Sequence, residues 1–198
     1  MVSARQCAEN PKQREGWEPK SMATADIRAA VGRVQSVLTR RPELGLHADT
    51  AAVARWDHDV SVLACHPNGT EFRTDMPPEL GGKGEAVTPG WLMRAGLAAC
   101  TVTCIALAAA ARGIELQTLE ARAASHSDAR GVLGMTDAEG VPVASAPREI
   151  ELSVRISARA VPAEQLRQLV EDTRRCSVVL CALEGRVPVH LRVEVGES

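Results

Sequence analysis

The sequence predicts an α+β fold, in which antiparallel strands and a few helices form one domain. Three observations carry this prediction. Apolar residues recur at helical spacing in three segments, they alternate with polar residues in the short segments between, and an Asn-Gly pair joins two of these short segments. The predicted order is helix, three strands, long helix, two strands, helix and strand. Strands that follow one another across short turns pair antiparallel, so this order argues against a doubly wound parallel sheet.

The first helix is expected over residues 24–41, where apolar residues lie three and four positions apart and Pro42 follows. Residues 1–21 are polar and charged and contain two prolines, which is typical of a loosely ordered segment. We therefore expect a flexible N-terminal arm over 1–21 and a single domain over 22–198 that begins with this extra helix.

Three short strands are expected at 51–56, 60–65 and 70–74. The second and third are separated by Pro67-Asn68-Gly69, and Asn-Gly is a strong hairpin signal. The three strands therefore form an antiparallel meander. Residues 75–87, which follow, are rich in Pro and Gly and are expected to form a loop.

The longest helix is expected to begin at Thr88 and Pro89 and to end at Arg112, before Gly113. It is apolar on nearly all sides, so it should be buried on several of them, with a second subunit over its outer face. Its apolar run, 95–111, is at the short limit for a membrane span and has an arginine at each end. We therefore expect a buried helix of a soluble protein and no membrane contact.

The C-terminal half is expected to contain two strands, a helix and a last strand. The two strands are expected at 114–125 and 149–159, separated by a segment rich in turn residues. Pro162 begins a second long helix, whose inner face carries apolar residues as far as Leu180. The last strand, 187–195, places every second residue, Val or Leu, on one side.

Length and composition limit the classes of function. The chain has 198 residues, enough for one domain with its own core, and 45% of them are hydrophobic. Its formal net charge is −2 and only 2% of its residues are aromatic, so nothing indicates binding to nucleic acid. Alanine occurs 31 times, and such small residues let helices approach closely.

Six cysteines raise the question of disulfides, metal binding or thiol chemistry. The first 20 residues contain no apolar segment of the kind found in signal peptides, so we expect a cytoplasmic protein with reduced thiols. The sequence contains neither a Cys-x-x-Cys pair nor a His-Glu-x-x-His motif, so we expect no metal. The cysteines are then either packing residues or parts of a thiol site.

Two pairs of cysteines fall on the two long helices. Cys100 and Cys104 are one turn apart and share a face of the first helix, where a disulfide is disfavoured because Cβ atoms at this spacing are about 5–6 Å apart. Cys176 and Cys181 are five residues apart on the second helix, so their directions differ by about 140°. At most one of them can face the first helix.

The sequence of the first long helix resembles that of the OsmC/Ohr family of osmotically inducible and organic hydroperoxide resistance proteins. The similarity lies in TPGWLMRAGLAAC (88–100), in the following TVTCIALAAAARGIEL, and in the downstream run SVVLCAL (177–183). It extends over about residues 50–195. The resemblance implies an intertwined α+β homodimer with two long central helices and a thiol site at the subunit interface.

The resemblance also assigns roles to individual residues. Active members of this family reduce organic hydroperoxides: one cysteine becomes a sulfenic acid, a second resolves it to a disulfide, and an external dithiol reduces the disulfide without a cofactor. The first cysteine corresponds to Cys100. The second position falls on Ser177, and Cys176 lies one residue early. Three ways of reducing the sulfenic acid therefore remain open. The resolving thiol is Cys176, or it is Cys104 after a local distortion, or Cys100 acts alone and is reduced directly.

The substrate-binding residues of the family correspond less directly to this sequence. A glutamate ten residues before the first cysteine is replaced by Gly90. The arginine that positions the substrate corresponds to Arg55, Arg73 or Arg94, and the resemblance does not decide among them. Trp91 is a candidate for lining an apolar pocket.

Two functions are therefore open for this sequence. The first is reduction of a small organic hydroperoxide at Cys100, as part of defence against oxidative stress. The second is binding of a small apolar ligand at the dimer interface without catalysis. The reactivity of Cys100 toward peroxide distinguishes them.

Overall fold

The computed structural model describes residues 23–185 and 187–195, and its elements alternate between helices and antiparallel strands. The predicted arm over 1–21 lies outside these residues. In chain order the elements are α1 (Thr24–Arg40), η3 (Pro42–Gly45), β1 (Val53–His58), β2 (Ser61–Cys65), β3 (Glu71–Thr74), η4 (Pro78–Leu80), α2 (Pro89–Ala111), β4 (Leu116–His126), α3 (Ala129–Val132), β5 (Glu149–Ala158), α4 (Ala163–Thr173), η5 (Arg174–Cys176) and α5 (Val178–Glu184).

The strands form two separate sheets, and the pairing within each is antiparallel, as the sequence predicts. β1, β2 and β3 form a three-stranded meander in which Val62 lies opposite Trp56 on one side and Thr74 on the other. β4 and β5 form a long two-stranded ribbon that runs from the Leu116–Ala158 pair to His126 and Glu149. The α+β class is therefore confirmed.

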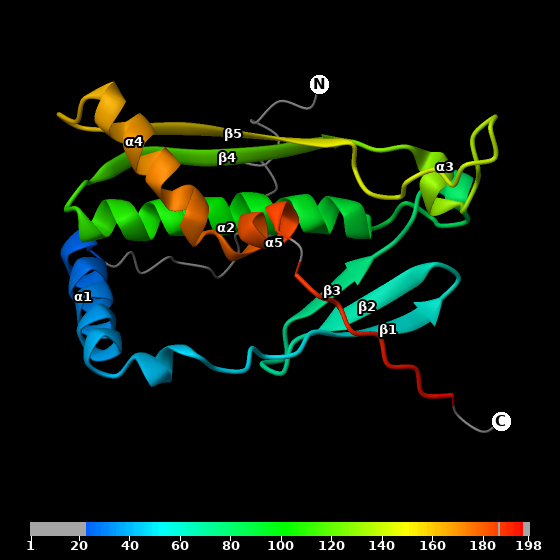
Figure 1. The fold of residues 1–198 in the computed structure, drawn as a ribbon, viewed down its shortest axis with the longest axis horizontal. Helices are drawn as coiled ribbons and strands as arrows, with labels where there is room; N and C mark the ends of the chain where they lie inside the picture. The colour runs from blue at the N-terminus through cyan, green and yellow to red at the C-terminus, as the bar shows by residue number, and fades with distance from the viewer. Residues whose placement is uncertain (1–22, 186, 196–198) are drawn as a thin grey trace.

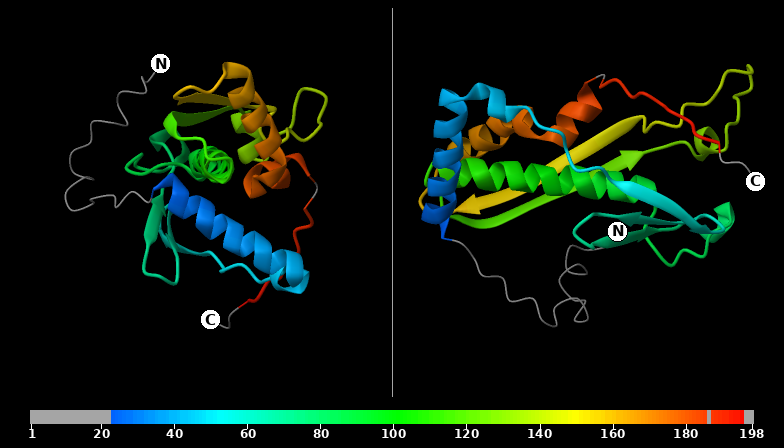
Figure 2. Two further views of the ribbon diagram at one scale, coloured as in Figure 1. Left: turned by 90° about the vertical axis from the view of Figure 1, so that its left-hand side faces the viewer. Right: turned by 90° about the horizontal axis from the view of Figure 1, so that it is seen from below.

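Helix α2 is the central element of the molecule (Figure 1). The β4–β5 ribbon covers one side of it, α4 and α5 lie along another, and α1 crosses the end where α2 finishes (Figure 2). By length and composition α2 could cross a membrane. It packs against α1, α4, α5 and β4, and 22% of its most apolar stretch is buried within the single chain.

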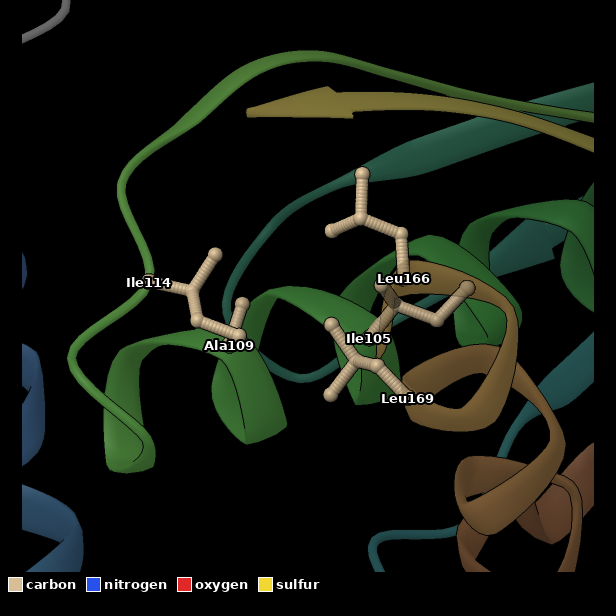
Figure 3. Packing of buried hydrophobic residues seen from close by; sticks show 5 residues of the cluster. All are labelled: Ile105, Ala109, Ile114, Leu166 and Leu169. Carbon is tan, nitrogen blue, oxygen red and sulfur yellow. The ribbon is translucent and has the colours of Figure 1, made fainter. Parts of the chain in front are cut away.

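The main hydrophobic core lies where α2, α4 and the β4–β5 ribbon meet (Figure 3). Ile105 and Ala109 of α2 pack against Leu166 and Leu169 of α4, and Ile114 closes the cluster after α2 ends. Burying a side chain of Leu or Ile size contributes about 1.5–3 kcal/mol. This cluster therefore fixes the position of α4 on α2, and with it the chain that follows α4.

The predicted ends of α2 are confirmed. The side chain of Thr88 accepts a hydrogen bond from the backbone N–H of Trp91, so Thr88 is the N-cap and Pro89 the first helical residue. Gly113 follows the helix with a φ of +69°, a left-handed conformation that glycine adopts without strain.

The prediction of one long helix from Pro162 past Leu180 is wrong in one respect. The helix ends at Thr173, a short 3₁₀ turn follows, and Ser177 adopts an extended conformation before α5 begins. The side chain of Ser177 accepts a hydrogen bond from the N–H of Leu180, so a serine N-cap starts a new helix here. The second long helix is therefore two shorter ones with a break at the family's second-cysteine position.

The prediction of a last strand over 187–195 is also wrong for the described chain. These residues form neither helix nor strand, and their apolar side chains lie in solvent, with Val189 92% and Leu191 88% exposed. The alternating pattern is present, but a strand needs a neighbouring strand to bond its backbone groups. No strand within the described residues pairs with this segment.

Candidate functional site

Cys100 of α2 and Ser177, the N-cap of α5, meet side chain to side chain. The Ser177 hydroxyl donates to the Cys100 sulfur, and the Oγ–Sγ distance is 3.3 Å. Ser177 is 2% exposed, whereas Cys100 is partly buried. The break between α4 and α5 creates this contact, because it places the first turn of α5 beside the middle of α2.

The surroundings of Cys100 favour its thiolate form. The Ser177 hydroxyl is the main cause of a lowered pKa of the Cys100 thiol, followed by the backbone N–H of Val179. Burial acts in the opposite direction and raises the pKa, while the N–H of Val178 and the thiol of Cys104 lower it further. The balance is a pKa below the ordinary thiol value, which makes Cys100 the more nucleophilic cysteine of α2 at neutral pH.

Cys104 lies one turn further along α2 and has the opposite character. Its sulfur is 3.2 Å from the backbone carbonyl oxygen of Cys176, to which its S–H donates. Burial and the neighbouring sulfur of Cys100 raise the pKa of Cys104 to about 11. Cys104 is therefore a protonated thiol at neutral pH.

Cys176 ends the 3₁₀ turn between α4 and α5, and Cys181 lies within α5. Both are exposed. The sulfur of Cys181 lies 3.6 Å from the carbonyl oxygen of Arg175, so it contacts the turn from the α5 side. Every cysteine within the described residues is free, and there Ser177, not Cys176, contacts the Cys100 sulfur.

The three candidate substrate-binding residues on α2 and β1 lie at different places in the chain. The guanidinium of Arg94 donates to the Ser125 hydroxyl of β4 over 3.2 Å, close to Gly90. Trp91 is about half exposed on the first turn of α2. Arg55 lies on β1, which is exposed along its whole length. Within residues 23–185 no hydrogen bond joins Cys100 to these side chains.

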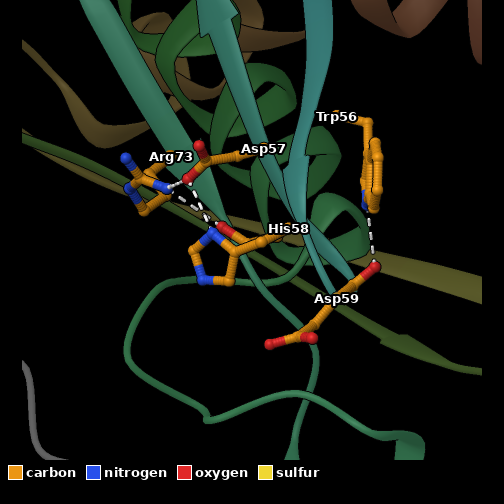
Figure 4. Close-up of polar contacts among 6 residues, drawn as sticks. Trp56, Asp57, His58, Asp59 and Arg73 are labelled. Atoms are coloured by element: carbon orange, nitrogen blue, oxygen red, sulfur yellow. Dashed lines mark hydrogen bonds and ion pairs between the residues drawn. The ribbon is translucent and has the colours of Figure 1, made fainter.

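Arg73 belongs to a separate polar cluster at one end of the three-stranded sheet (Figure 4). Its guanidinium forms an ion pair with Asp57 of β1 and donates to the Ser61 hydroxyl over 3.1 Å. The same Asp57 carboxylate accepts from the ring of His58. Arg73 is therefore engaged with its own sheet within one chain.

A cavity of about 290 Å³, lined in part by Ser177, lies between β5 and the helices α4 and α5. Its lining is apolar on the β5 side and includes three hydroxyl residues, Thr101, Thr173 and Ser177. The hydroxyl of Ser177 contacts the Cys100 sulfur. Glu171, Arg174 and Glu184 stand together at this cavity, and Arg174 forms ion pairs with both glutamates. The apolar lining residues are Ile150, Leu152, Val154, Val170 and Leu180.

Sequence reasoning missed the groups that act on Cys100 through the backbone. The N–H groups of Val178 and Val179 lower the pKa of its thiol only because a helix begins at Ser177. A signal was available: a serine directly before an apolar run is typical of an N-cap. The helical spacing of apolar residues on both sides of Ser177 hid it.

Fold and site together define a class of protein: a helix-centred α+β domain in which a partly buried cysteine meets the N-cap of a second helix. The chain belongs to the family of OsmC-like proteins, whose pattern it matches over residues 82–192. A search of curated protein sequences finds no relative.

Solved structures share the fold at low sequence identity. An OsmC-like protein from Mycoplasma pneumoniae has a TM-score of 0.58 and 18% identity over 71% of this chain and 91% of its own. An OsmC-like protein of unknown function from Vibrio cholerae has a TM-score of 0.56 and 11% identity over 70% and 95%. An organic hydroperoxide resistance protein from Elizabethkingia anophelis has a TM-score of 0.51 and 19% identity over 71% and 91%. These likenesses establish the fold.

Proposed function

We propose that this protein reduces small organic hydroperoxides at Cys100, in a cycle that uses one cysteine of the chain and external thiols. The observation that carries the proposal is the contact between Ser177 Oγ and the Cys100 sulfur at 3.3 Å. A hydrogen-bond donor on a partly buried sulfur stabilises the thiolate, which is the form that attacks a peroxide. The family relationship to hydroperoxide resistance proteins supports the same reaction.

In the first step the Cys100 thiolate attacks one oxygen of the peroxide. The S–O bond forms as the O–O bond breaks, and the alkoxide that leaves takes up a proton from solvent to become an alcohol. The sulfur is oxidised by two electrons to a sulfenic acid, and the hydroperoxide is reduced by the same two electrons. The Ser177 hydroxyl remains next to this sulfur throughout.

In the second step an external thiol reduces the sulfenic acid directly. Its sulfur attacks the Cys100 sulfur, a mixed disulfide forms and water leaves. A second thiol, or the other sulfur of the same dithiol, then attacks the external sulfur of this mixed disulfide. Cys100 leaves as a thiolate, and the two external sulfurs depart joined in a disulfide. The side chain that meets Cys100 is a serine, which cannot form a disulfide, so the chain supplies no resolving thiol at that point.

We further propose that the protein acts as a homodimer. The apolar residues of segment 187–195 are exposed in the single chain, and so is β1 with Trp56 at 75%. Exposed apolar residues in this number favour association, and a second copy offers matching surfaces by symmetry. Trp91 and one of Arg55, Arg73 and Arg94 would complete the substrate site in this assembly.

The test is peroxide consumption by the wild type and by Cys100→Ser. We expect the wild type to consume cumene hydroperoxide once per chain without reductant and repeatedly with dithiothreitol, and the variant to consume none above buffer. Cys65→Ser is the matched control, because Cys65 lies on β2 and belongs to a different sheet; it should keep full activity. Turnover by Cys100→Ser at the wild-type rate would refute the assignment.

The cavity beside Ser177 favours a second function, binding of a small apolar ligand without catalysis. Its volume of about 290 Å³ is at the lower end for small-molecule sites, and its β5 wall is apolar. Under this function wild-type Cys100 would consume no peroxide, while an apolar fluorescent probe would bind. Leu152→Trp, which fills the cavity, would abolish probe binding.

A further inference from the structure

We propose that Cys104 is a positioning residue, whose S–H group holds the Cys176–Ser177 turn so that Ser177, and not Cys176, meets the Cys100 sulfur. This inference rests on the proposed role of Cys100 as the reacting thiol. It assigns to Cys104 a task that neither the family relationship nor the peroxide chemistry requires.

The geometry connects the two cysteines of α2 to one peptide. Cys104 lies one helical turn after Cys100, so both sulfurs emerge from the same face of α2. The Cys104 sulfur is 3.2 Å from the carbonyl oxygen of Cys176. That carbonyl belongs to the peptide bond whose nitrogen is that of Ser177, and the Ser177 hydroxyl is 3.3 Å from Cys100. The hydrogen bond from Cys104 therefore fixes the backbone position of Ser177, whose hydroxyl contacts Cys100.

The role of donor also explains why Cys104 is unsuited to resolve a sulfenic acid. Resolution requires a thiolate, whereas burial, the largest cause of the raised pKa of Cys104, favours its protonated form. In addition, cysteines one turn apart on a helix have Cβ atoms about 5–6 Å apart, beyond the range of about 3.5–4.5 Å in disulfides. Only a protonated thiol donates a hydrogen bond. The protonated form of Cys104 therefore holds the Cys176–Ser177 turn and, for the same reason, does not attack a sulfenic acid.

Holding the turn has a measurable consequence at Cys100. If the Cys176 carbonyl loses its donor, the Ser177 hydroxyl and the N–H groups after it are less firmly placed. Donors that are less firmly placed stabilise the thiolate less, so the Cys100 thiol becomes a weaker acid.

The experiment measures the acidity of Cys100 without using peroxide. Full-length wild type, Cys104→Val and Cys104→Ser are alkylated with iodoacetamide between pH 5 and 11, and the modification of Cys100 is followed by peptide mass spectrometry. Valine fills the site without a donor, and we expect the midpoint of Cys100 alkylation to rise by about half to one pH unit. Serine donates a hydrogen bond, so Cys104→Ser should remain within ~0.3 unit of the wild type.

Cys181→Ala is the matched control, since its sulfur contacts the same turn from the α5 side, at the carbonyl oxygen of Arg175. It should leave the midpoint unchanged. An unchanged midpoint in Cys104→Val, an equal rise in Cys104→Ser, or an equal rise in Cys181→Ala would each overturn the proposal. Because the readout is alkylation, the midpoint shift can be found in a protein that consumes no peroxide. In that case the inference stands and the proposed function fails.

Discussion

The thiol site and the C-terminal segment differ in how much of their structure one chain supplies. At the thiol site each polar group has a partner: the Ser177 hydroxyl donates to Cys100 and accepts from the N–H of Leu180, and the S–H of Cys104 donates to a carbonyl. In segment 187–195, by contrast, the apolar side chains lie in solvent, with Leu191 88% exposed.

This difference separates the acidity of Cys100 from the assembly of the protein. The groups that lower the pKa of the Cys100 thiol belong to its own chain, so this acidity should not depend on a second subunit. Segment 187–195 has the alternation of a strand, but no strand among the residues that the structure describes pairs with it, so its structure should depend on a second subunit.

Ser177→Cys should convert the one-cysteine site into a disulfide-forming pair. Because the wild-type Ser177 oxygen is 3.3 Å from the Cys100 sulfur, a cysteine there has its sulfur within reach of a sulfenic acid. One equivalent of hydroperoxide should then give the Cys100–Cys disulfide nearly completely, seen as a loss of two hydrogens in the intact mass. The wild type should instead give a sulfenic acid that reacts with dimedone.

The wild type is the internal control for this variant, since Cys176 is present in both proteins. If wild-type protein forms a Cys100–Cys176 disulfide as fast as the variant forms its own, the turn at Ser177 rearranges on oxidation. Cys176 would then be the resolving thiol, and the one-cysteine cycle would be wrong.

Leu191→Asp should weaken the homodimer ~100-fold or more. Burying a leucine contributes about 1.5–3 kcal/mol, the change occurs twice in a symmetric dimer, and a buried carboxylate costs more. Sedimentation equilibrium measures the dissociation constant. His190→Asp is the matched control, because alternation places His190 on the opposite side of the segment. A dimer equally stable in both variants would show that the apolar side of 187–195 lies outside the interface.

The sequence allowed much of the fold and part of the site to be predicted, and the failures have physical causes. Helical spacing and the Thr88 and Gly113 caps predicted α2 within a residue, because such local signals act within one turn. The break at Ser177 was missed because apolar residues keep helical spacing from Leu166 to Leu180 across it. A single capping side chain, not the periodicity, decides where the helix divides.

Two further limits concern contacts that depend on the whole fold. The alternation in 187–195 indicates that these residues suit a strand, but it does not indicate whether a partner strand lies beside them. Likewise, the spacing of Cys104 from Cys100 shows that they share a face of α2, but not that a carbonyl 72 residues away lies 3.2 Å from Cys104. Such contacts follow from how α4 packs on α2, which no local pattern encodes.

Ser177→Ala should have the smallest effect, and it tests whether the Ser177 hydroxyl sets the acidity of Cys100. The variant loses the donor that lowers the pKa of the thiol, so this pKa rises and the thiolate fraction at neutral pH falls. We expect the rate of Cys100 alkylation at pH 7 to fall about three- to tenfold and its midpoint to shift upward. The variant also loses an N-cap, which costs about 1 kcal/mol of unfolding free energy.

Thr88→Ala separates these two consequences. Thr88 caps α2 through the same kind of hydrogen bond, to the N–H of Trp91, but lies twelve residues before Cys100. It should lower the stability by a similar amount in urea unfolding and leave the alkylation midpoint in place. A midpoint that moves equally in both variants would mean that general loosening, and not the Ser177 hydroxyl, controls Cys100. A midpoint that moves only in Ser177→Ala assigns the low pKa to a donor within the same chain.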